Sequence, residues 1–129
     1  MIKGTQIMRK TGAALAAIAL FAACAPQALA HHSAAMFDFT KSVQVKGVVK
    51  EFTAMNPHLR LMLVVTDAKG NHDIGFEGHS LNNMYRGGWR PGKVKIGDQI
   101  TINIAPERDG SEGGYVTSIV TATGEKIGM

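Results

Sequence analysis

The chain has 129 residues, a formal net charge of +4, five histidines and one cysteine. Three of its cations (Lys3, Arg9 and Lys10) lie among the first ten residues, and residues 1–30 contain no acidic residue. Without these three cations the net charge falls from +4 to about +1. The remaining chain then has little electrostatic reason to bind the phosphates of a nucleic acid.

Residues 1–30 have the pattern of a cleavable signal peptide. An apolar run from Ala13 to Ala23 follows the cations, Pro26 interrupts it, and Ala28-Leu29-Ala30 places small residues where signal peptidase cuts. The run is shorter than the ~20 residues of a membrane-spanning helix, so a cleaved signal is favoured over a retained anchor. We therefore predict a periplasmic or secreted bacterial protein whose mature form starts at His31 and does not span the membrane.

A second cleavage position competes with this one. Residues 20–24 end in Cys24 and resemble a lipoprotein processing box, although Phe21 stands where such boxes usually carry leucine. Cleavage before Cys24 would lipidate the cysteine and leave the histidines inside a lipid-tethered linker. Cleavage after Ala30 would instead remove the cysteine, so the mature domain would have neither a disulfide nor a thiolate metal site.

The residues after the signal peptide are enough for one domain. We divide them into an N-terminal segment (31–42), a β domain (43–123) and a tail (124–129), of which Gly124 to Lys126 are expected to be exposed. Alternating apolar residues predict a long first strand from Val43, with Gly47 marking a bend or a bulge.

Two further strands are predicted before the pattern changes. The Asn56-Pro57 turn precedes a second strand in which alternate residues from Leu59 to Val65 face one side. A hairpin connection with Gly70 at positive φ leads to a shorter third strand, over about Asp73 to Glu77.

Helical spacing then replaces the alternation. Ser80 is a good N-cap for a helix of two to three turns, which Gly87-Gly88 ends, and Trp89 is expected to fill the core beneath it. Strands four and five are predicted at Ile100–Ile104 and Tyr115–Thr121. This order predicts a mostly β protein: a small OB-like five-stranded antiparallel barrel with one short helix between strands three and four. A small open antiparallel sheet with one packed helix is the alternative.

The mature N-terminus carries the strongest chemical signal. A terminal His31 offers its α-amine and its ring nitrogen to one metal ion, and a nitrogen of another histidine would complete the set. His32 offers a different chelate, formed by the α-amine, a deprotonated amide and its own ring nitrogen. His58, at the start of a predicted strand, is the natural further ligand. Nitrogen donors suit Cu(II), while Met36 and Met55 could add soft donors for Cu(I). Zinc, which also accepts nitrogen and oxygen donors, is the second choice.

Simpler interpretations compete with this metal site. His31 and His32 could form a solvated end, and His58 could be a hydrogen-bonded turn residue. His72 is expected to be solvated in its hairpin turn, and His79, beside the helix N-cap, to be structural or on the surface. Carboxylate and serine spacings show no catalytic motif, so nothing in the sequence argues for an enzyme.

A second functional hypothesis needs no metal. An OB-type domain could grip an envelope peptide or saccharide through stacking and hydrogen bonds near Arg60, Arg86, Trp89 and Arg90. The competing interpretation is that Trp89 belongs to the core and that the arginines are solvated.

Several stretches together resemble a family of small bacterial secreted proteins catalogued as a domain of unknown function. They are His31-His32-Ser33, Met36-Phe37-Asp38, Val45–Val49, Met55-Asn56-Pro57-His58, Phe76-Glu77-Gly78, Arg86–Trp89, Lys95–Asp98, Asp109-Gly110-Ser111 and Gly113-Gly114. The resemblance implies a signal peptide, a small mostly β domain and a pairing of the His31-His32 start with Asn56-Pro57-His58. The chain departs from the family pattern at His79, where a small residue is usual, and at Leu59–Met62, where an aromatic-rich strand is commoner.

Overall fold

The computed structural model describes residues 32–129, so the predicted signal peptide and His31 lie outside the described residues. The chain divides into two compact units at Ala35/Met36. The short helix α2 (His32–Ala35) belongs to the first unit, and residues 36–129 form the second. Within the described residues, no helix has the length and apolar character needed to cross a membrane.

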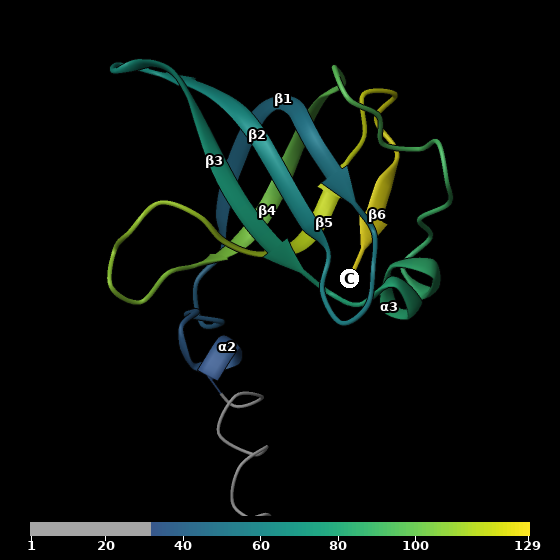
Figure 1. The fold of residues 1–129 in the computed structure, drawn as a ribbon, viewed down its shortest axis with the longest axis horizontal. Helices are drawn as coiled ribbons and strands as arrows, with labels where there is room; N and C mark the ends of the chain where they lie inside the picture. The colour runs from purple at the N-terminus through teal and green to yellow at the C-terminus, as the bar shows by residue number, and fades with distance from the viewer. Residues whose placement is uncertain (1–31) are drawn as a thin grey trace, which may run out of the picture. The chain divides into compact units, whose positions relative to one another are not determined.

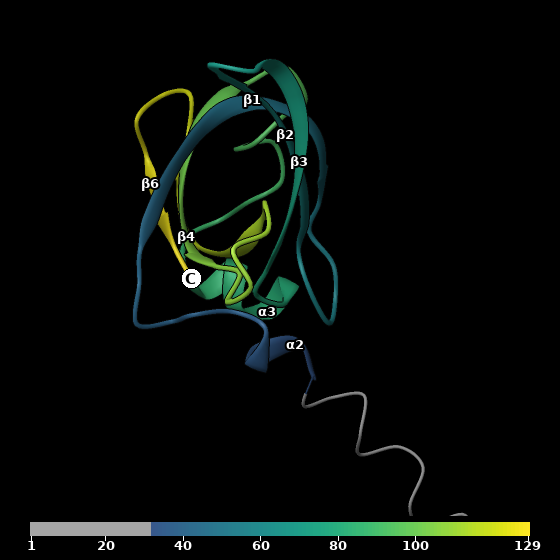
Figure 2. The ribbon, with the colours of Figure 1, turned by 90° about the vertical axis from the view of Figure 1, so that its left-hand side faces the viewer.

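A single antiparallel sheet of six strands dominates the second unit, in the order β3-β2-β1-β4-β5-β6 (Figure 1). The strands are β1 (Val43–Thr53), β2 (Arg60–Asp67), β3 (Gly70–Gly78), β4 (Gln99–Pro106), β5 (Gly114–Val120) and β6 (Lys126–Gly128). A short parallel pairing of β3 with β5 joins the ends of the first five strands into a ring. Figure 2 shows the long β1 curving around one side of this ring.

The core fills the inside of the ring because the apolar residues alternate along the strands. Leu61 and Leu63 of β2, and Ile100, Ile102 and Ile104 of β4, are all buried. Burying one such side chain stabilises the fold by roughly 1.5–3 kcal/mol relative to exposure. The predicted inward face of the second strand is therefore confirmed.

Gly47 does not mark the bulge that its position in β1 suggested. The register shift in the β1–β2 ladder lies between Val49 and Glu51. A Cβ at Gly47 would approach the Val64 carbonyl oxygen to 2.8 Å, so the missing side chain lets β1 and β2 pack closely. Of the bend or bulge predicted at Gly47, the bulge is therefore wrong, and the close approach of β1 to β2 is what requires a glycine there.

The predicted helix is α3 (Leu81–Arg86), which is shorter than the two to three turns expected. The Ser80 side chain accepts a hydrogen bond from the Asn83 backbone N–H, and Gly87 forms the C-cap. Trp89 follows the helix and is buried, as predicted. The helix thus connects β3 to β4, in the predicted place.

The strand count differs from the prediction of five. Residues 124–126 are exposed, as expected, but the next residue, Ile127, is fully buried in β6. The β6 strand pairs with β5 through Ile119 opposite Ile127. Strand β3 is also longer than expected, because it begins directly at the Gly70 turn.

Candidate functional site

His58 lies half-buried just before β2, and its ring orientation is held by the neighbouring strand. Its Nδ1 is 3.3 Å from the Gly78 carbonyl oxygen at the end of β3. Because a carbonyl can only accept, Nδ1 is the donor in this contact, and in the neutral form of the ring the lone pair is then on Nε2. A backbone carbonyl holding one ring nitrogen is the usual support for a histidine that binds metal through the other.

His79 directly follows β3, at the end of the hairpin where His58 precedes β2. The β2–β3 ladder places Arg60 opposite Glu77. Beyond that pair, the Leu59 N–H donates to the His79 carbonyl (3.0 Å) and the Gly78 N–H donates to the Leu59 carbonyl (3.1 Å). Leu59 is thus bonded to two successive residues, Gly78 and His79, so the regular pairing ends here with an irregularity like a β-bulge. Both histidines lie at this end of the hairpin.

Tyr115 joins the two histidines from a third strand. Its ring is edge-on to both imidazoles, with centroids 6.4 Å from His58 and 5.0 Å from His79. Tyr115 is the second residue of β5 and pairs with Glu77 through the parallel β3–β5 contact that closes the ring. We call His58, His79 and Tyr115 the histidine–tyrosine cluster.

Burial changes the acid–base behaviour of two cluster members. Desolvation, and then the nearby charge of His58, lower the pKa of His79. Desolvation, and then Glu77, raise the pKa of Tyr115. At neutral pH the His79 imidazole is therefore neutral and the Tyr115 phenol protonated. A neutral imidazole is the form that can donate a lone pair to a metal ion.

The start of the second unit is fixed beside the same tyrosine. The Phe37 and Phe39 rings lie 5.4 Å and 5.3 Å from the Tyr115 ring. Phe37 is buried and forms an isolated β-bridge with Glu107, while the Arg108 N–H donates to the Met36 carbonyl (2.8 Å). The chain that follows His32 by only a few residues is thus anchored at Tyr115.

A family model for DUF6152, a family of unknown function, matches residues 18–117. The chain belongs to this family. The match covers the whole histidine–tyrosine cluster and confirms the resemblance to a domain of unknown function. No curated protein is similar enough to match the chain.

The predicted metal ligands of this DUF6152 member are His31, His32 and His58, and the structure describes the side chain of only one of them. His31 lies outside the described residues, and His32 lies in α2 with no description of its side chain. His58 belongs to the cluster. Among residues 32–129, no three histidine, cysteine or acidic side chains are grouped closely enough to hold a metal ion.

Sequence reasoning did not give His79 a role in the site. The signal was nevertheless present in the predicted hairpin, whose turn pairs Asp67 with Gly70. Counting outward from that pair, one residue at a time on each strand, brings residues 58 and 79 to the same end of the hairpin, where the hydrogen bonds of Leu59 to both Gly78 and His79 interrupt the regular register. Register is strongly specified in a strand with one buried face, so this count requires only the amino-acid sequence and the position of the turn.

His72 is also less solvated than predicted. Its Nε2 is 3.2 Å from a Glu112 carboxylate oxygen and 3.6 Å from one of Asp67, and its side chain is about 25% exposed. Glu112 lies in the glycine-rich loop between β4 and β5. The histidine therefore connects the β2–β3 hairpin to that loop.

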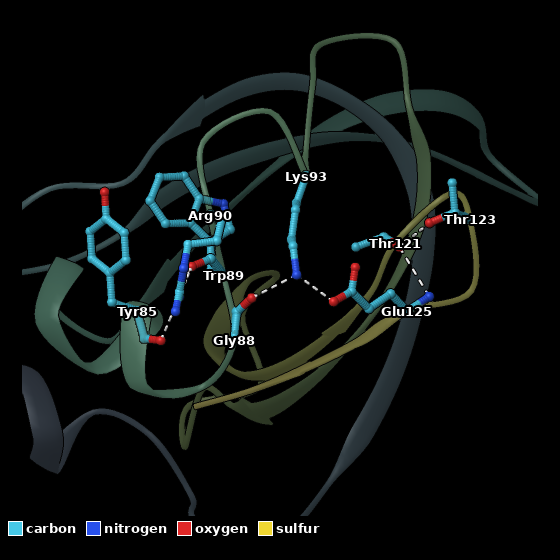
Figure 3. Close-up of polar contacts among 8 residues, drawn as sticks. All are labelled: Tyr85, Gly88, Trp89, Arg90, Lys93, Thr121, Thr123 and Glu125. Atoms are coloured by element: carbon cyan, nitrogen blue, oxygen red, sulfur yellow. Dashed lines mark hydrogen bonds and ion pairs between the residues drawn. The ribbon is translucent and has the colours of Figure 1, made fainter.

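The metal-free binding hypothesis involves the segment after α3, around Trp89 and Arg90. The residues of this segment make hydrogen bonds and packing contacts within the fold (Figure 3). Arg90 lies over the Tyr85 ring and donates to the Tyr85 and Trp89 carbonyls, at 2.9 and 2.6 Å. Lys93 donates to the Gly88 carbonyl (3.0 Å) and pairs with Glu125. Trp89 itself is buried in the core. These polar groups hold the segment after α3 against the end of β5 and the turn that follows it.

Proposed function

We propose that this DUF6152 member is an exported copper-binding protein, a carrier or buffer rather than a catalyst. Copper would be held by the α-amine and ring of His31 at the mature N-terminus, by His32 and by His58. The observation that carries the proposal is the His58 ring: Nδ1 faces the Gly78 carbonyl, which leaves Nε2 as a preoriented, half-buried donor.

The position of the anchored segment supports the same site. Met36 is held by Arg108, and the residues after it pack on Tyr115, whose ring is 6.4 Å from that of His58. His31 precedes Met36 by five residues, a length of chain that can extend about 16–18 Å. A mature N-terminus at His31 therefore has enough chain to reach His58.

The donor types favour copper over harder cations. Amine and imidazole nitrogens suit Cu(II), which has the highest affinity among the divalent first-row metals. Met36 and Met55 are 53% and 41% exposed, so their thioethers are accessible as soft donors for Cu(I). Zinc is the second choice because it accepts the same nitrogens in tetrahedral sites.

An OB-like fold is the finer structural proposal that accompanies this function. The five strands of the ring adjoin one another in the order β1-β2-β3-β5-β4, and α3 lies between β3 and β4. A five-stranded, partly open Greek-key ring with these neighbours is the architecture of OB domains. Such a fold would support the candidate site because it fixes the start of β2, which His58 precedes by two residues.

A metal-free binding module is the second candidate. Its exposed arginines, Arg60 and Arg86, favour it, whereas Trp89 and Arg90 are already used within the fold. Copper binding is the better-supported function because, within residues 32–129, the hydrogen bond of His58 uses Nδ1 and leaves Nε2 as a candidate donor.

The test of the proposed function uses protein exported with its own residues 1–30 and purified from the periplasm. Intact mass of the denatured protein would establish that the first residue is His31 and that Cys24 is neither retained nor lipidated. Native mass spectrometry and competition titration should then give one Cu(II) per chain, bound with near-stoichiometric tightness. Failure of the verified His31 form to hold copper at micromolar concentrations would overturn the proposal.

Two variants locate the site. An alanine inserted between Ala30 and His31 keeps every side chain but separates the α-amine from His31, and should weaken Cu(II) binding at least about tenfold. His58→Ala should weaken it similarly, while His72→Ala, a histidine outside the proposed ligand set, should leave it unchanged. Equal copper binding in all four proteins would contradict the assignment.

A further inference from the structure

We propose that His72 is a proton-operated latch, which fastens the glycine-rich loop 107–113 to the β2–β3 hairpin when its imidazole is charged. The loop connects β4 to β5. It projects from the same side of the sheet as the hairpin (Figure 1). The proposal concerns residues 36–129 alone and goes beyond copper binding, on which it does not depend.

Both ring nitrogens of His72 face hydrogen-bond acceptors. Nδ1 is 3.3 Å from the Gly70 carbonyl oxygen. Nε2 is 3.2 Å from a carboxylate oxygen of Glu112 and 3.6 Å from one of Asp67. A neutral imidazole carries one proton, so its other nitrogen would turn a lone pair toward one of these acceptors. Only the imidazolium, which has a proton on each nitrogen, suits both sides of the ring.

The surroundings of Nε2 favour the charged ring. The atom is shielded from solvent and has no aligned hydrogen bond, so the two carboxylates act on it through their charge. Asp67 is fixed in the hairpin turn, because its other carboxylate oxygen accepts from the Lys69 N–H (2.7 Å). An opposite charge at such a short distance favours the charged form of a titratable group.

The other neighbours of the ring carry no competing charge toward it. The Lys50–Asp73 ion pair involves the next residue of β3, whose side chain points to the opposite face of the sheet. On β2, the cross-strand partner of His72 is the apolar Val65. Within the described residues, the two carboxylates are therefore the charged groups that form ion-pair contacts with the imidazole.

The part of the loop that carries Glu112 is flanked by glycines. Gly110 and Gly113 have φ values of +79° and +110°, which glycine adopts without strain. The start of the loop is fixed by its backbone, since the Arg108 N–H donates to the segment that precedes β1 (2.8 Å). The later part is fastened to the hairpin through the contact of Glu112 with His72.

The fastened loop lies beside an edge of β3. Strand β5 pairs with β3 at Glu77 and Gly78. Nearer the hairpin turn the loop lies against β3 instead, because a Cβ at Gly113 would be 2.8 Å from the Gly75 carbonyl oxygen. Release of the loop would uncover this backbone edge, and uncovered edges are where strands of other chains can pair.

The latch should close as the pH falls and open as it rises. Histidine ordinarily exchanges its proton between about pH 5 and pH 8, whereas aspartate and glutamate stay ionised over this range. A histidine whose charged form is favoured by the fold stabilises it at the acidic end, and this contribution is lost as the pH rises. Because the contacts are partly exposed, the population of released loop should rise about two- to fivefold across this range.

The test is nuclear magnetic resonance of the metal-free protein at about pH 5 and about pH 8. Amide shifts and order parameters are measured for Ser111, Glu112 and Gly113. In the parent these amides should shift together with the His72 ring resonances, and their order parameters should fall from about 0.85 toward about 0.6 at the higher pH. His72→Gln and Glu112→Gln should lose this response and show low order parameters at both pH values.

Glu51→Gln is the matched control, because it makes the same change of charge on β1 and should respond like the parent. Order parameters that are equal at both pH values in the parent would overturn the proposal. So would a Glu112→Gln loop that keeps the response of the parent, because the ion pair would then not be its cause. Circular dichroism shows whether each variant folds, and His72→Gln and Glu112→Gln remove opposite partners, so either folded variant decides the result.

Discussion

The positions of His58 and His79 are set by contacts with the backbone of neighbouring residues. Neither lies in a motif with metal-ligand spacing, because 20 intervening positions separate them in the chain. The Gly78 carbonyl faces the ring of the first, and the hydrogen bond from the Leu59 N–H to the His79 carbonyl fixes the backbone of the second at the end of the hairpin. At this scale the site depends on strand register, which also determines which residues of β2 are buried.

Asp38 gives a prediction of pH dependence at the residue scale. Hydrogen bonds from the Thr40 side chain and then from Lys41 lower the pKa of Asp38 from 3.8 to about 2. A carboxyl with a lowered pKa in the folded state stabilises the fold above its unfolded value, and this contribution is lost as the pH falls through the folded value. Asp38→Asn should therefore unfold at a lower temperature than the parent at pH 7.

The measurement is thermal unfolding followed by circular dichroism at several pH values. The difference between Asp38→Asn and the parent should close between about pH 4 and pH 2, where the native carboxyl takes up its proton. Lys41→Ala is the control and should have the smaller effect, because the lysine side chain is largely exposed and exposed ion pairs contribute little. A difference that is constant with pH would show that the charge of Asp38 is not the cause.

Strand β6 is only three residues long but contributes a fully buried side chain to the core. Its three residues place Ile127 opposite Ile119 of β5, and both side chains are fully buried. Burial of an isoleucine at the edge of the core explains why so short a strand stays paired.

Ile127→Ala should lower the free energy of unfolding by about 2–5 kcal/mol, since it removes buried methyl groups and leaves a cavity. Ile96→Ala is the matched control, because Ile96 is 75% exposed and its truncation should be nearly neutral. Chemical denaturation of both variants measures the difference. Equal stability of the two would mean that β6 does not contribute to the cooperative core.

At the scale of the whole fold, distant parts of the chain hold one another in place. The Gly128 N–H donates to the Gly87 carbonyl (3.1 Å), which ties β6 to the end of α3, and Figure 1 shows the C-terminus beside this helix. A Cβ at Gly87 would lie 1.5 Å from the Gly128 carbonyl oxygen. The glycine is therefore required by a contact with the other end of the domain.

Gly87→Ala should displace the C-terminal residues and cost about 1–3 kcal/mol of stability. Gly75→Ala is the matched control, because a Cβ there would meet nothing within 4 Å. Hydrogen exchange of the β6 amides, together with the denaturation midpoint, measures the effect. Unchanged exchange at Gly128 in Gly87→Ala would show that the two segments are not coupled.

Local patterns of the sequence were sufficient for most of the elements. Alternation identified β1, β2, β4 and β5, and the cap at Ser80 with the glycines after Arg86 identified α3. These features succeed because strand period, capping and turn geometry depend on residues close together in the chain. The same reasoning placed His58 at the start of a strand.

The tertiary structure decided what depends on contacts between distant residues. Three residues are too few for a pattern, so β6 emerged only from its pairing with β5. The closure of the ring by β3 and β5, and the meeting of Tyr115 with His58 and His79, join segments far apart in the sequence. The sequence alone determined the family resemblance, the mostly β class and one histidine of the candidate site. Only the packed sheet decided which side chains stand beside that histidine, because spatial proximity across strands follows from register and closure.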